Sequence, residues 1–204
     1  MSDPKPDLTL RGFEIYSGFL DLAAQTALVD DIRNVVRAAP LFSPDTPYGR
    51  PMSVRMTSAG DYGWYSDRTG YRYRTTHPNG SPWPPIPQSV LNVWQSVAQS
   101  PRIPQCCLIN FYAEGAKMGM HQDKDEADFV NPVVSISLGD EAQFRIGNST
   151  RGGKTESVWL RSGDVVVFGG DARLTYHGVD RIRHGSSTLL PNGGRINLTL
   201  RVVD

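Results

Sequence analysis

Two stretches of the chain place apolar residues at helical spacing. Over residues 21–39 they recur every three or four positions, and the stretch begins with Asp21 and is followed by Pro40. Aspartate caps helix N-termini and proline cannot continue a helix, so this pattern predicts a helix over 21–39. The same spacing from about residue 87 to 99, followed by Pro101, predicts a second helix whose apolar stripe packs in the core.

From residue 106 onward the pattern changes to short apolar and alternating runs, separated by polar and glycine-rich turns. These runs predict strands over 106–113, 133–138, 142–147, 156–161, 164–168, 174–177 and 195–203. Many short strands joined by such turns are typical of a sandwich or jelly roll. We therefore expect a mainly β fold with flanking helices, in which rolled-up antiparallel sheets bring distant residues together.

The segment between the two predicted helices, residues 43–85, is rich in proline, glycine and tyrosine. This composition predicts turns and short hairpins. Arginines are interleaved there with tyrosines and Trp64, and aromatic faces combined with guanidinium groups suit unstacked bases and their phosphates. The alternative is that these side chains cap the solvent-exposed edge of a sheet. Residues 43–85 are thus a candidate substrate-recognition lid.

Composition limits the class of protein. The chain has 204 residues, of which 39% are hydrophobic, and it carries 21 basic and 21 acidic residues. This length fits one domain over 1–204, with a core over 106–204, and the zero net charge argues mildly against coating nucleic acid through bulk charge. Without a long apolar run, a secretion signal or a cysteine framework, we expect a cytoplasmic, monomeric protein that does not engage membranes.

The run from His121 to Asp123, together with the distant His177, forms a candidate metal site. Residues i and i+2 of a strand point to the same face, so His121 and Asp123 can converge on one ion. Two imidazoles and a carboxylate leave the other positions of the ion open, which is typical of non-haem Fe(II) oxygenases, whereas a structural zinc site closes its shell. Against this, H-x-D occurs often by chance, and His177 alone is equally a core or surface histidine.

The C-terminal segment 195–202 alternates polar and apolar residues with a strict period of two, which predicts a strand with one polar and one apolar face. The polar face carries Arg195, Asn197, Thr199 and Arg201. Arginine grips a carboxylate through two parallel hydrogen bonds, and a 2-oxoglutarate dioxygenase needs such a grip beside its iron. An exposed edge strand would show the same alternation.

Together these motifs resemble the AlkB family of Fe(II)/2-oxoglutarate-dependent nucleic-acid demethylases. H-x-D, the distant histidine and R-x-N-x-T-x-R match the family signature, as do the runs 108–115, 135–139 and 163–167. The likeness covers roughly residues 10–204 and points to the bacterial AlkB branch. It implies a double-stranded β-helix (jelly roll) with an N-terminal nucleotide-recognition lid over its mouth.

The resemblance also implies the cofactors and the site residues. His121, Asp123 and His177 would be the catalytic ligands of Fe(II), with 2-oxoglutarate and O2 in the open positions. The residues implied to bind 2-oxoglutarate are Asn110, Tyr112, Arg195, Asn197 and Arg201. Those implied to bind the substrate are Trp64, Tyr71, His121, Asp125 and Arg151. The residues themselves leave other interpretations open: Trp64 as a core residue, Asp125 as a member of a solvent-exposed ion pair, and Arg151 as a loop charge.

The implied reaction is oxidative demethylation of N-alkylated bases, such as 1-methyladenine and 3-methylcytosine, in single- or double-stranded DNA. It would release formaldehyde, succinate and CO2. A target base inside a duplex must leave the stack to reach the metal. Three alternatives stay open: demethylation of RNA or tRNA with the same chemistry, hydroxylation of a small molecule or protein, and a β-roll that binds without turnover.

Overall fold

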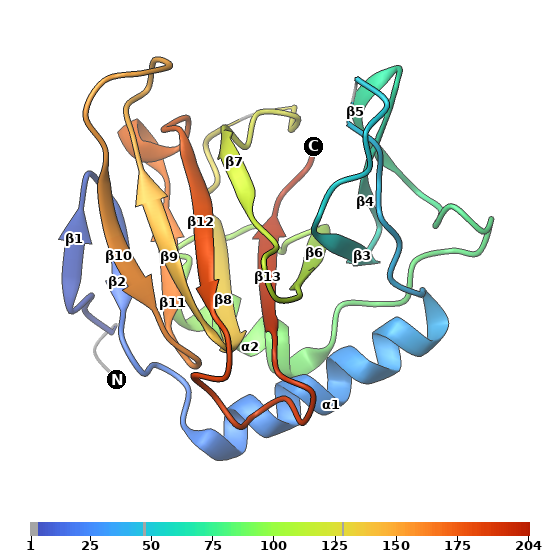
Figure 1. Ribbon diagram of the computed structural model, residues 1–204, viewed down its shortest axis with the longest axis horizontal. Coiled ribbons are helices and arrows are strands. Elements are labelled where there is room, and N and C mark those ends of the chain that lie inside the picture. Colours follow the sequence, from blue (N-terminus) through green and yellow to red (C-terminus); the bar gives the residue numbers. More distant parts are fainter. Residues whose placement is uncertain (1–3, 47, 128) are drawn as a thin grey trace.

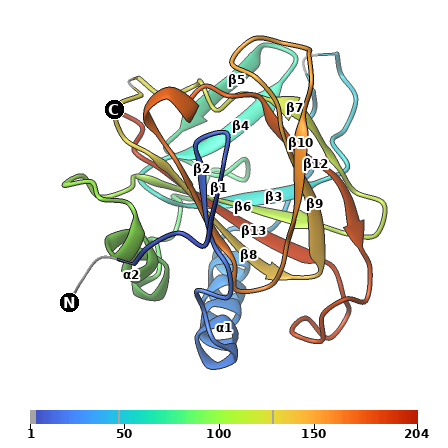
Figure 2. The same ribbon diagram turned by 90° about the vertical axis from the view of Figure 1, so that its left-hand side faces the viewer.

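The computed structural model describes residues 4–46, 48–127 and 129–204, in which two antiparallel sheets face each other (Figure 1, Figure 2). The strands of the larger sheet follow the order β1 (Leu8–Leu10), β2 (Phe13–Tyr16), β11 (Val165–Phe168), β8 (Val133–Gly139), β13 (Arg195–Arg201), β6 (Cys106–Tyr112) and β3 (Arg55–Gly60). The smaller sheet follows the order β10 (Glu156–Leu160), β9 (Glu141–Ile146), β12 (His177–Arg183) and β7 (Met118–His121). A separate hairpin pairs β4 (Gly63–Asp67) with β5 (Gly70–Arg74).

From β6 onward the chain crosses repeatedly between the two sheets. After β7 in the smaller sheet comes β8 in the larger; β9 and β10 return to the smaller sheet, and β11, β12 and β13 then alternate. This path is a double-stranded β-helix, and it confirms the predicted mainly β jelly roll with flanking helices. It also brings His121 and His177, which lie far apart in the sequence, to paired positions on neighbouring strands.

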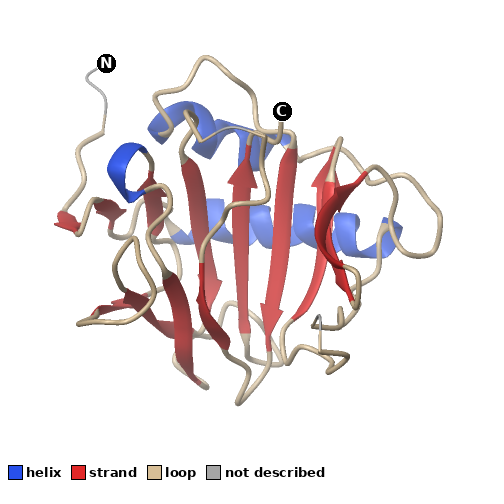
Figure 3. Cartoon of the chain, turned by 90° about the horizontal axis from the view of Figure 1, so that it is seen from above, coloured by secondary structure: helices blue, strands red, loops and turns tan. Residues whose placement is uncertain are grey.

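Both predicted helices form, and Figure 3 shows them behind the strands of the larger sheet. Helix α1 (Leu22–Ala38) begins where Asp21 accepts a hydrogen bond from the Ala24 backbone at 2.8 Å, the predicted cap. Helix α2 (Gln88–Val97) ends two residues before the predicted boundary. Their buried stripes form one hydrophobic cluster with the outer face of the sheet. Within the described residues, no helix is long and apolar enough to cross a membrane.

Strand β13 lies in the centre of the larger sheet, between β8 and β6. Ile196, Leu198 and Leu200 belong to the cluster shared with the helices, so the alternate, polar residues face the other sheet. Arg195 and Arg201 are both buried. The interpretation as an exposed edge strand is therefore wrong.

The sequence pattern misplaced one strand and missed β1, β2, β3 and β7; β3 lies within residues 43–85, where only turns and short hairpins were predicted. The strand predicted over 174–177 begins at His177 and continues to Arg183, because a bulge between Val179 and Arg181 breaks its period of two. Strands β1, β2 and β7 have only three or four residues each, too few to show a period.

Candidate metal centre and substrate pocket

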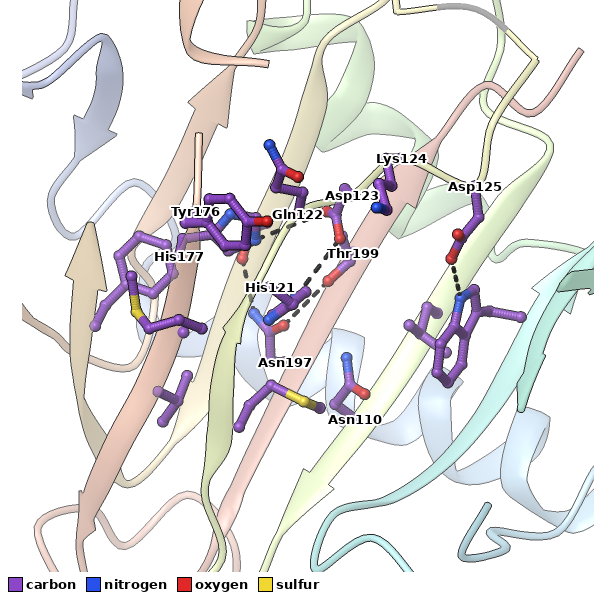
Figure 4. A pocket seen from close by; sticks show the side chains of 18 of the residues that line it. Asn110, His121, Gln122, Asp123, Lys124, Asp125, Tyr176, His177, Asn197 and Thr199 are labelled. Atoms are coloured by element: carbon purple, nitrogen blue, oxygen red, sulfur yellow. Dashed lines mark hydrogen bonds and ion pairs between the residues drawn. The ribbon is translucent and has the colours of Figure 1, made fainter. Parts of the chain in front are cut away.

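Three side chains able to bind a metal converge between the two sheets. His121 ends β7 and pairs across the strands with His177, the first residue of β12. Asp123 lies beyond the end of β7, so the prediction that it shares a strand with His121 is wrong, although their side chains do converge. The ligand atoms of the three residues all lie within 4.8 Å of one another. Figure 4 shows the three side chains in one pocket.

Backbone carbonyls set the protonation of both imidazole rings. Nδ1 of His121 lies 2.9 Å from the oxygen of Gly119, and Nδ1 of His177 lies 2.9 Å from that of Thr175. A carbonyl oxygen only accepts, so each Nδ1 carries a proton and each Nε2 keeps its lone pair for a metal. Burial and the neighbouring His121 lower the pKa of His177 to about 4. This ring is therefore neutral at neutral pH, as a metal ligand must be.

Asp123 is buried and nevertheless ionised. Burial by itself raises its pKa, but Arg201 and the two histidines outweigh burial and hold the pKa of Asp123 below its ordinary value. Arg201 Nη2 lies 2.8 Å from Oδ1. The other oxygen, Oδ2, has no hydrogen-bond partner in the described part of the chain and lies 3.9 Å from Nε2 of His177. An unpartnered buried carboxylate oxygen beside two Nε2 atoms fits a divalent cation.

A buried cluster of charges backs Asp123. Arg201 lies 3.5 Å from Glu126, and Arg173 lies 3.1 Å from the other oxygen of Glu126. The hydroxyl of Tyr73 donates to Glu126 at 2.5 Å and accepts from Arg201 at 3.1 Å. Two arginines thus face two carboxylates, which offsets the cost of burying each charge. Sequence reasoning missed Glu126 and Arg173 because neither belongs to a spaced motif.

Arg195 lies behind the pocket, paired across the strands with Tyr112 and only 1% exposed. It donates to the hydroxyl of Ser137 at 2.7 Å and to the carbonyl of Asp140 at 3.2 Å, while its Nε has no partner among the described residues. Burial lowers the pKa of Arg195 to about 10. Because a buried guanidinium with only neutral partners is costly, a small carboxylic acid beside it would complete the site.

Between Arg195 and the three ligands lie polar side chains of two neighbouring strands. Asn110 of β6 pairs across the strands with Asn197 of β13, and the side-chain oxygen of Asn110 has no partner in the described residues. Asn197 donates to Ser135 at 2.8 Å. Burial raises the pKa of Tyr112 to about 12, so its hydroxyl stays protonated and able to donate. The Asn110 and Asn197 amides and the Tyr112 hydroxyl provide the hydrogen-bond donors that an ionised diacid needs.

The mouth of the pocket is aromatic. Trp64 of β4 and Tyr71 of β5 stack with ring centroids 5.3 Å apart and planes 21° from parallel. The Trp64 indole donates to Asp125 at 2.8 Å (Figure 4). Both rings, with Asp125 and Arg151, line the same pocket of about 260 Å³ as the candidate ligands. Trp64 is therefore a pocket residue rather than a core residue.

The structure brings together nearly all residues singled out in the sequence. Arg195 is the exception, because it lies behind the wall that the others form. The sequence did not reveal the apolar part of the wall, since apolar residues in strands ordinarily indicate core. That part consists mainly of Met52, Met56, Leu108, Met118, Met120, Phe144, Phe168 and Val179.

Comparisons with known proteins show the class of protein to which the chain belongs. A family model of the 2OG-Fe(II) oxygenase superfamily matches residues 12–201, so the chain is an Fe(II)/2-oxoglutarate-dependent dioxygenase that uses O2. The alpha-ketoglutarate-dependent dioxygenase AlkB homolog of Caulobacter vibrioides (strain NA1000 / CB15N) is 52% identical over 97% of this chain and 90% of that protein. AlkB of Escherichia coli K12 is 43% identical over 87% and 84%.

A solved structure agrees with these relatives. The structure of OsALKBH1 superposes with a TM-score of 0.82 and 31% identity, covering 96% of this chain and 99% of that one. The chain belongs to the AlkB family, which confirms the resemblance found in its sequence motifs.

Proposed function

We propose that this enzyme is an oxidative demethylase that repairs N-alkylated bases, such as 1-methyladenine and 3-methylcytosine, in DNA. One observation carries the proposal: the three candidate ligands and the stacked Trp64–Tyr71 pair line the same pocket. A flat aromatic surface beside a metal suits an extruded or single-stranded base better than a small flexible acid. Bound iron, 2-oxoglutarate and O2 would supply oxidation of the methyl group, with formaldehyde, succinate and CO2 released.

His121, Asp123 and His177 would hold the iron. The carbonyls of Gly119 and Thr175 orient the two rings so that each Nε2 is available. Arg201 keeps Asp123 ionised and leaves its Oδ2 unpartnered. Three protein ligands would leave the other positions of the ion open for the cofactor and O2.

Arg195 would pair with the distal carboxylate of 2-oxoglutarate. It is buried without an acidic hydrogen-bond partner, so a carboxylate would satisfy its charge. Asn110, Tyr112 and Asn197 would donate hydrogen bonds to the remaining oxygens of the diacid. Arg201, already bonded to Asp123, would act at the end nearer the iron.

Trp64 and His121 would sandwich the damaged base, with Asp125 near its exocyclic nitrogen. Asp125 already accepts from Trp64, so one carboxylate orients the stacking ring and offers negative charge to a cationic methylated base. Tyr71 is half-exposed and Arg151 exposed, which suits contacts with the nucleic acid outside the pocket. Residues 43–85, which include the β4–β5 hairpin, would serve as the recognition lid over the core 106–204.

The candidate site is complete within one chain, which supports a monomeric enzyme. Cys106 and Cys107 are free and buried, as expected for a protein of the reducing cytoplasm. We also propose that the enzyme is a cytoplasmic monomer with a single domain over 1–204.

The proposal is tested by turnover of oligonucleotides that differ only in the lesion and the sugar. Iron-loaded protein should release formaldehyde and succinate in equal amounts with single- and double-stranded DNA carrying one 1-methyladenine or 3-methylcytosine. Unmethylated DNA is the control. Matched RNA oligonucleotides test the alternative of an RNA or tRNA demethylase. Absence of formaldehyde with every nucleic acid, despite succinate release with another substrate, would contradict the proposal.

A further inference from the structure

The turn between the first two strands places an arginine in an unusual conformation. Arg11 and Gly12 join β1 to β2, with φ angles of 50° and 81°. Two consecutive residues with positive φ are typical of a tight type I′ hairpin turn, where asparagine or glycine usually stands. Arginine rarely adopts the left-handed conformation, because its Cβ crowds the following carbonyl. The contacts of its side chain therefore need an explanation.

The Arg11 side chain forms hydrogen bonds with residues at both ends of the loop 147–155. Its Nε donates to Glu156 at 2.6 Å, and its Nη1 donates to the carbonyl of Gly147 at 2.9 Å and to the side chain of Asn148 at 2.6 Å. Gly147 and Asn148 begin the loop between β9 and β10, and Glu156 follows its end. Asn148 in turn donates to the carbonyl of Gly152 at 2.7 Å. One guanidinium thus spans the root of the loop 147–155.

The hairpin that carries Arg11 is anchored beside the candidate metal ligands. A Cβ added to Gly12 would lie 2.9 Å from the Ala172 Cβ, so the turn packs directly on the segment before β12. Phe13 is fully buried and stacks on Phe168 with centroids 4.5 Å apart. Its ring also lies edge-on to His177 at 5.8 Å. The turn therefore has a defined place relative to His177.

The loop itself has few contacts beyond its root. Residues 149–157 are all exposed, and Gly152 and Gly153 have φ angles of 100° and 80°. Glycines in that region give a loop freedom that other residues lack. Arg151, in the middle of this exposed stretch, nevertheless lines the pocket. Its place thus depends on how the root of the loop is held.

We propose that Arg11 is a positioning residue for nucleic-acid binding, because its three contacts orient the loop 147–155 and thereby aim Arg151 at the substrate's phosphate backbone. The inference rests on the proposed function, which puts Arg151 against nucleic acid. Arg11 acts here through Arg151 and does not itself touch the substrate. Its contacts with Glu156 and with neutral oxygens occupy the guanidinium as long as the loop is in place.

A double-mutant cycle tests the inference through binding alone. The protein is loaded with Ni²⁺ and 2-oxoglutarate, so that no turnover occurs, and the Kd of a fluorescein-labelled single strand carrying one 1-methyladenine is measured by anisotropy. Arg11→Ala and Arg151→Ala should each raise this Kd about three- to tenfold. The double variant should bind no more weakly than Arg151→Ala alone, because Arg11 has nothing left to position. Additive losses would overturn the inference.

A second variant separates positioning from direct contact. Glu156→Ala removes the acidic partner of Arg11 together with one negative charge at the rim. If Arg11 positions the loop, this variant should raise the Kd although it makes the surface more positive. Tighter binding would mean that the freed Arg11 contacts phosphate itself, and the inference would be wrong. Arg11→Lys, which keeps the charge but loses the fork, should remain weaker than the unaltered protein.

Controls distinguish this inference from loss of folding and from failure of the proposed function. Arg33→Ala removes an equal charge from an exposed ion pair with Asp30 on α1 and should leave the Kd unchanged. The Kd of 2-oxoglutarate should stay within twofold in Arg11→Ala; a parallel rise would indicate a merely structural role and overturn the inference. If Arg151→Ala leaves oligonucleotide binding unchanged, the proposed role of Arg151 fails. If it weakens binding while Arg11→Ala does not, only the positioning inference fails.

Discussion

The floor of the pocket is its buried part around Asp123, His177 and Arg201, and the rim is its exposed part around Trp64, Tyr71 and the loop 147–155. The two regions are built in different ways. At the floor, Asp123, His177 and Arg201 are each 5% exposed, and the charges of Asp123 and Arg201 are paired with each other and, for Arg201, also with Glu126. At the rim, Tyr71 is 50% exposed, and the loop 147–155 is exposed over most of its length. Buried charges require well-placed partners, whereas exposed hairpins and loops open at little cost. The proposed metal and cofactor residues thus lie where the fold is most constrained, and the proposed substrate-binding residues where it is least constrained.

Removal of a ligand at the floor should have the largest effect. Asp123→Ala deletes the carboxylate, so succinate release should fall below a tenth of the wild-type rate. Arg201 keeps its contacts with Glu126 and Tyr73 in this variant, so the fold should persist. Asp123→Asn, which preserves shape, serves as the second variant, and thermal melting checks both. A folded variant that kept a tenth of the activity would refute the ligand assignment.

At the rim, Trp64→Ala should weaken turnover of methylated oligonucleotide about ten- to a hundredfold, because base–aromatic stacking contributes about 1–3 kcal/mol. The measurement is kcat/KM with a single-stranded substrate. The affinity for 2-oxoglutarate, measured by calorimetry, should change little because the residues proposed to bind the cofactor lie at the floor. If kcat/KM and the affinity for 2-oxoglutarate fell together, Trp64 would also stabilise the floor of the pocket. The contrast between the two regions would then be lost.

Replacement of Arg195 or Arg201 by lysine tests whether the planar shape of the guanidinium matters, because the positive charge is kept. Arg195→Lys and Arg201→Lys keep the positive charge but remove the planar fork. The KM for 2-oxoglutarate should rise about tenfold, which corresponds to about 1.4 kcal/mol. The KM for oligonucleotide should change less. An unchanged KM for 2-oxoglutarate in both variants would mean that these arginines serve the fold alone.

A smaller effect is expected on the stability of the fold at high pH, through the two buried thiols of Cys106 and Cys107. Burial raises the pKa of Cys106 to about 12 and that of Cys107 further still. The fold therefore favours the protonated thiols, so their contribution to stability is complete below pH 9 and declines as pH rises toward 12. Urea unfolding at pH 10 should show a loss of about 1.4 kcal/mol per thiol relative to pH 8. Cys106→Ala should reduce that loss; an equal loss in the variant would contradict the assignment.

The sequence predicted the regular elements better than the irregular ones. Alternation over Arg195–Arg201 indicated a strand with a polar face, and a central strand needs such regularity. Helix α1 with its Asp21 cap was predicted equally well. The bulged strand β12 was misplaced, because a bulge interrupts the period of two on which strand prediction depends.

Other parts of the site had no local signal. Glu126 meets Arg173 and Arg201 only through the crossing of the chain between sheets. The β1–β2 hairpin is too short to show periodicity, and an arginine in its turn contradicts the residue preference for such turns. These contacts and this turn therefore depend on long-range packing, which the local sequence pattern does not show.

The most direct measurement is a diffraction experiment on crystals grown with Mn²⁺ and 2-oxoglutarate under anaerobic conditions. We expect one anomalous peak about 2 Å from Nε2 of His121, Nε2 of His177 and a carboxylate oxygen of Asp123. The distal carboxylate of the cofactor should pair with Arg195, whose guanidinium otherwise has only neutral hydrogen-bond partners. A peak away from these three atoms, or a cofactor carboxylate that leaves Arg195 unpaired, would contradict the proposed site.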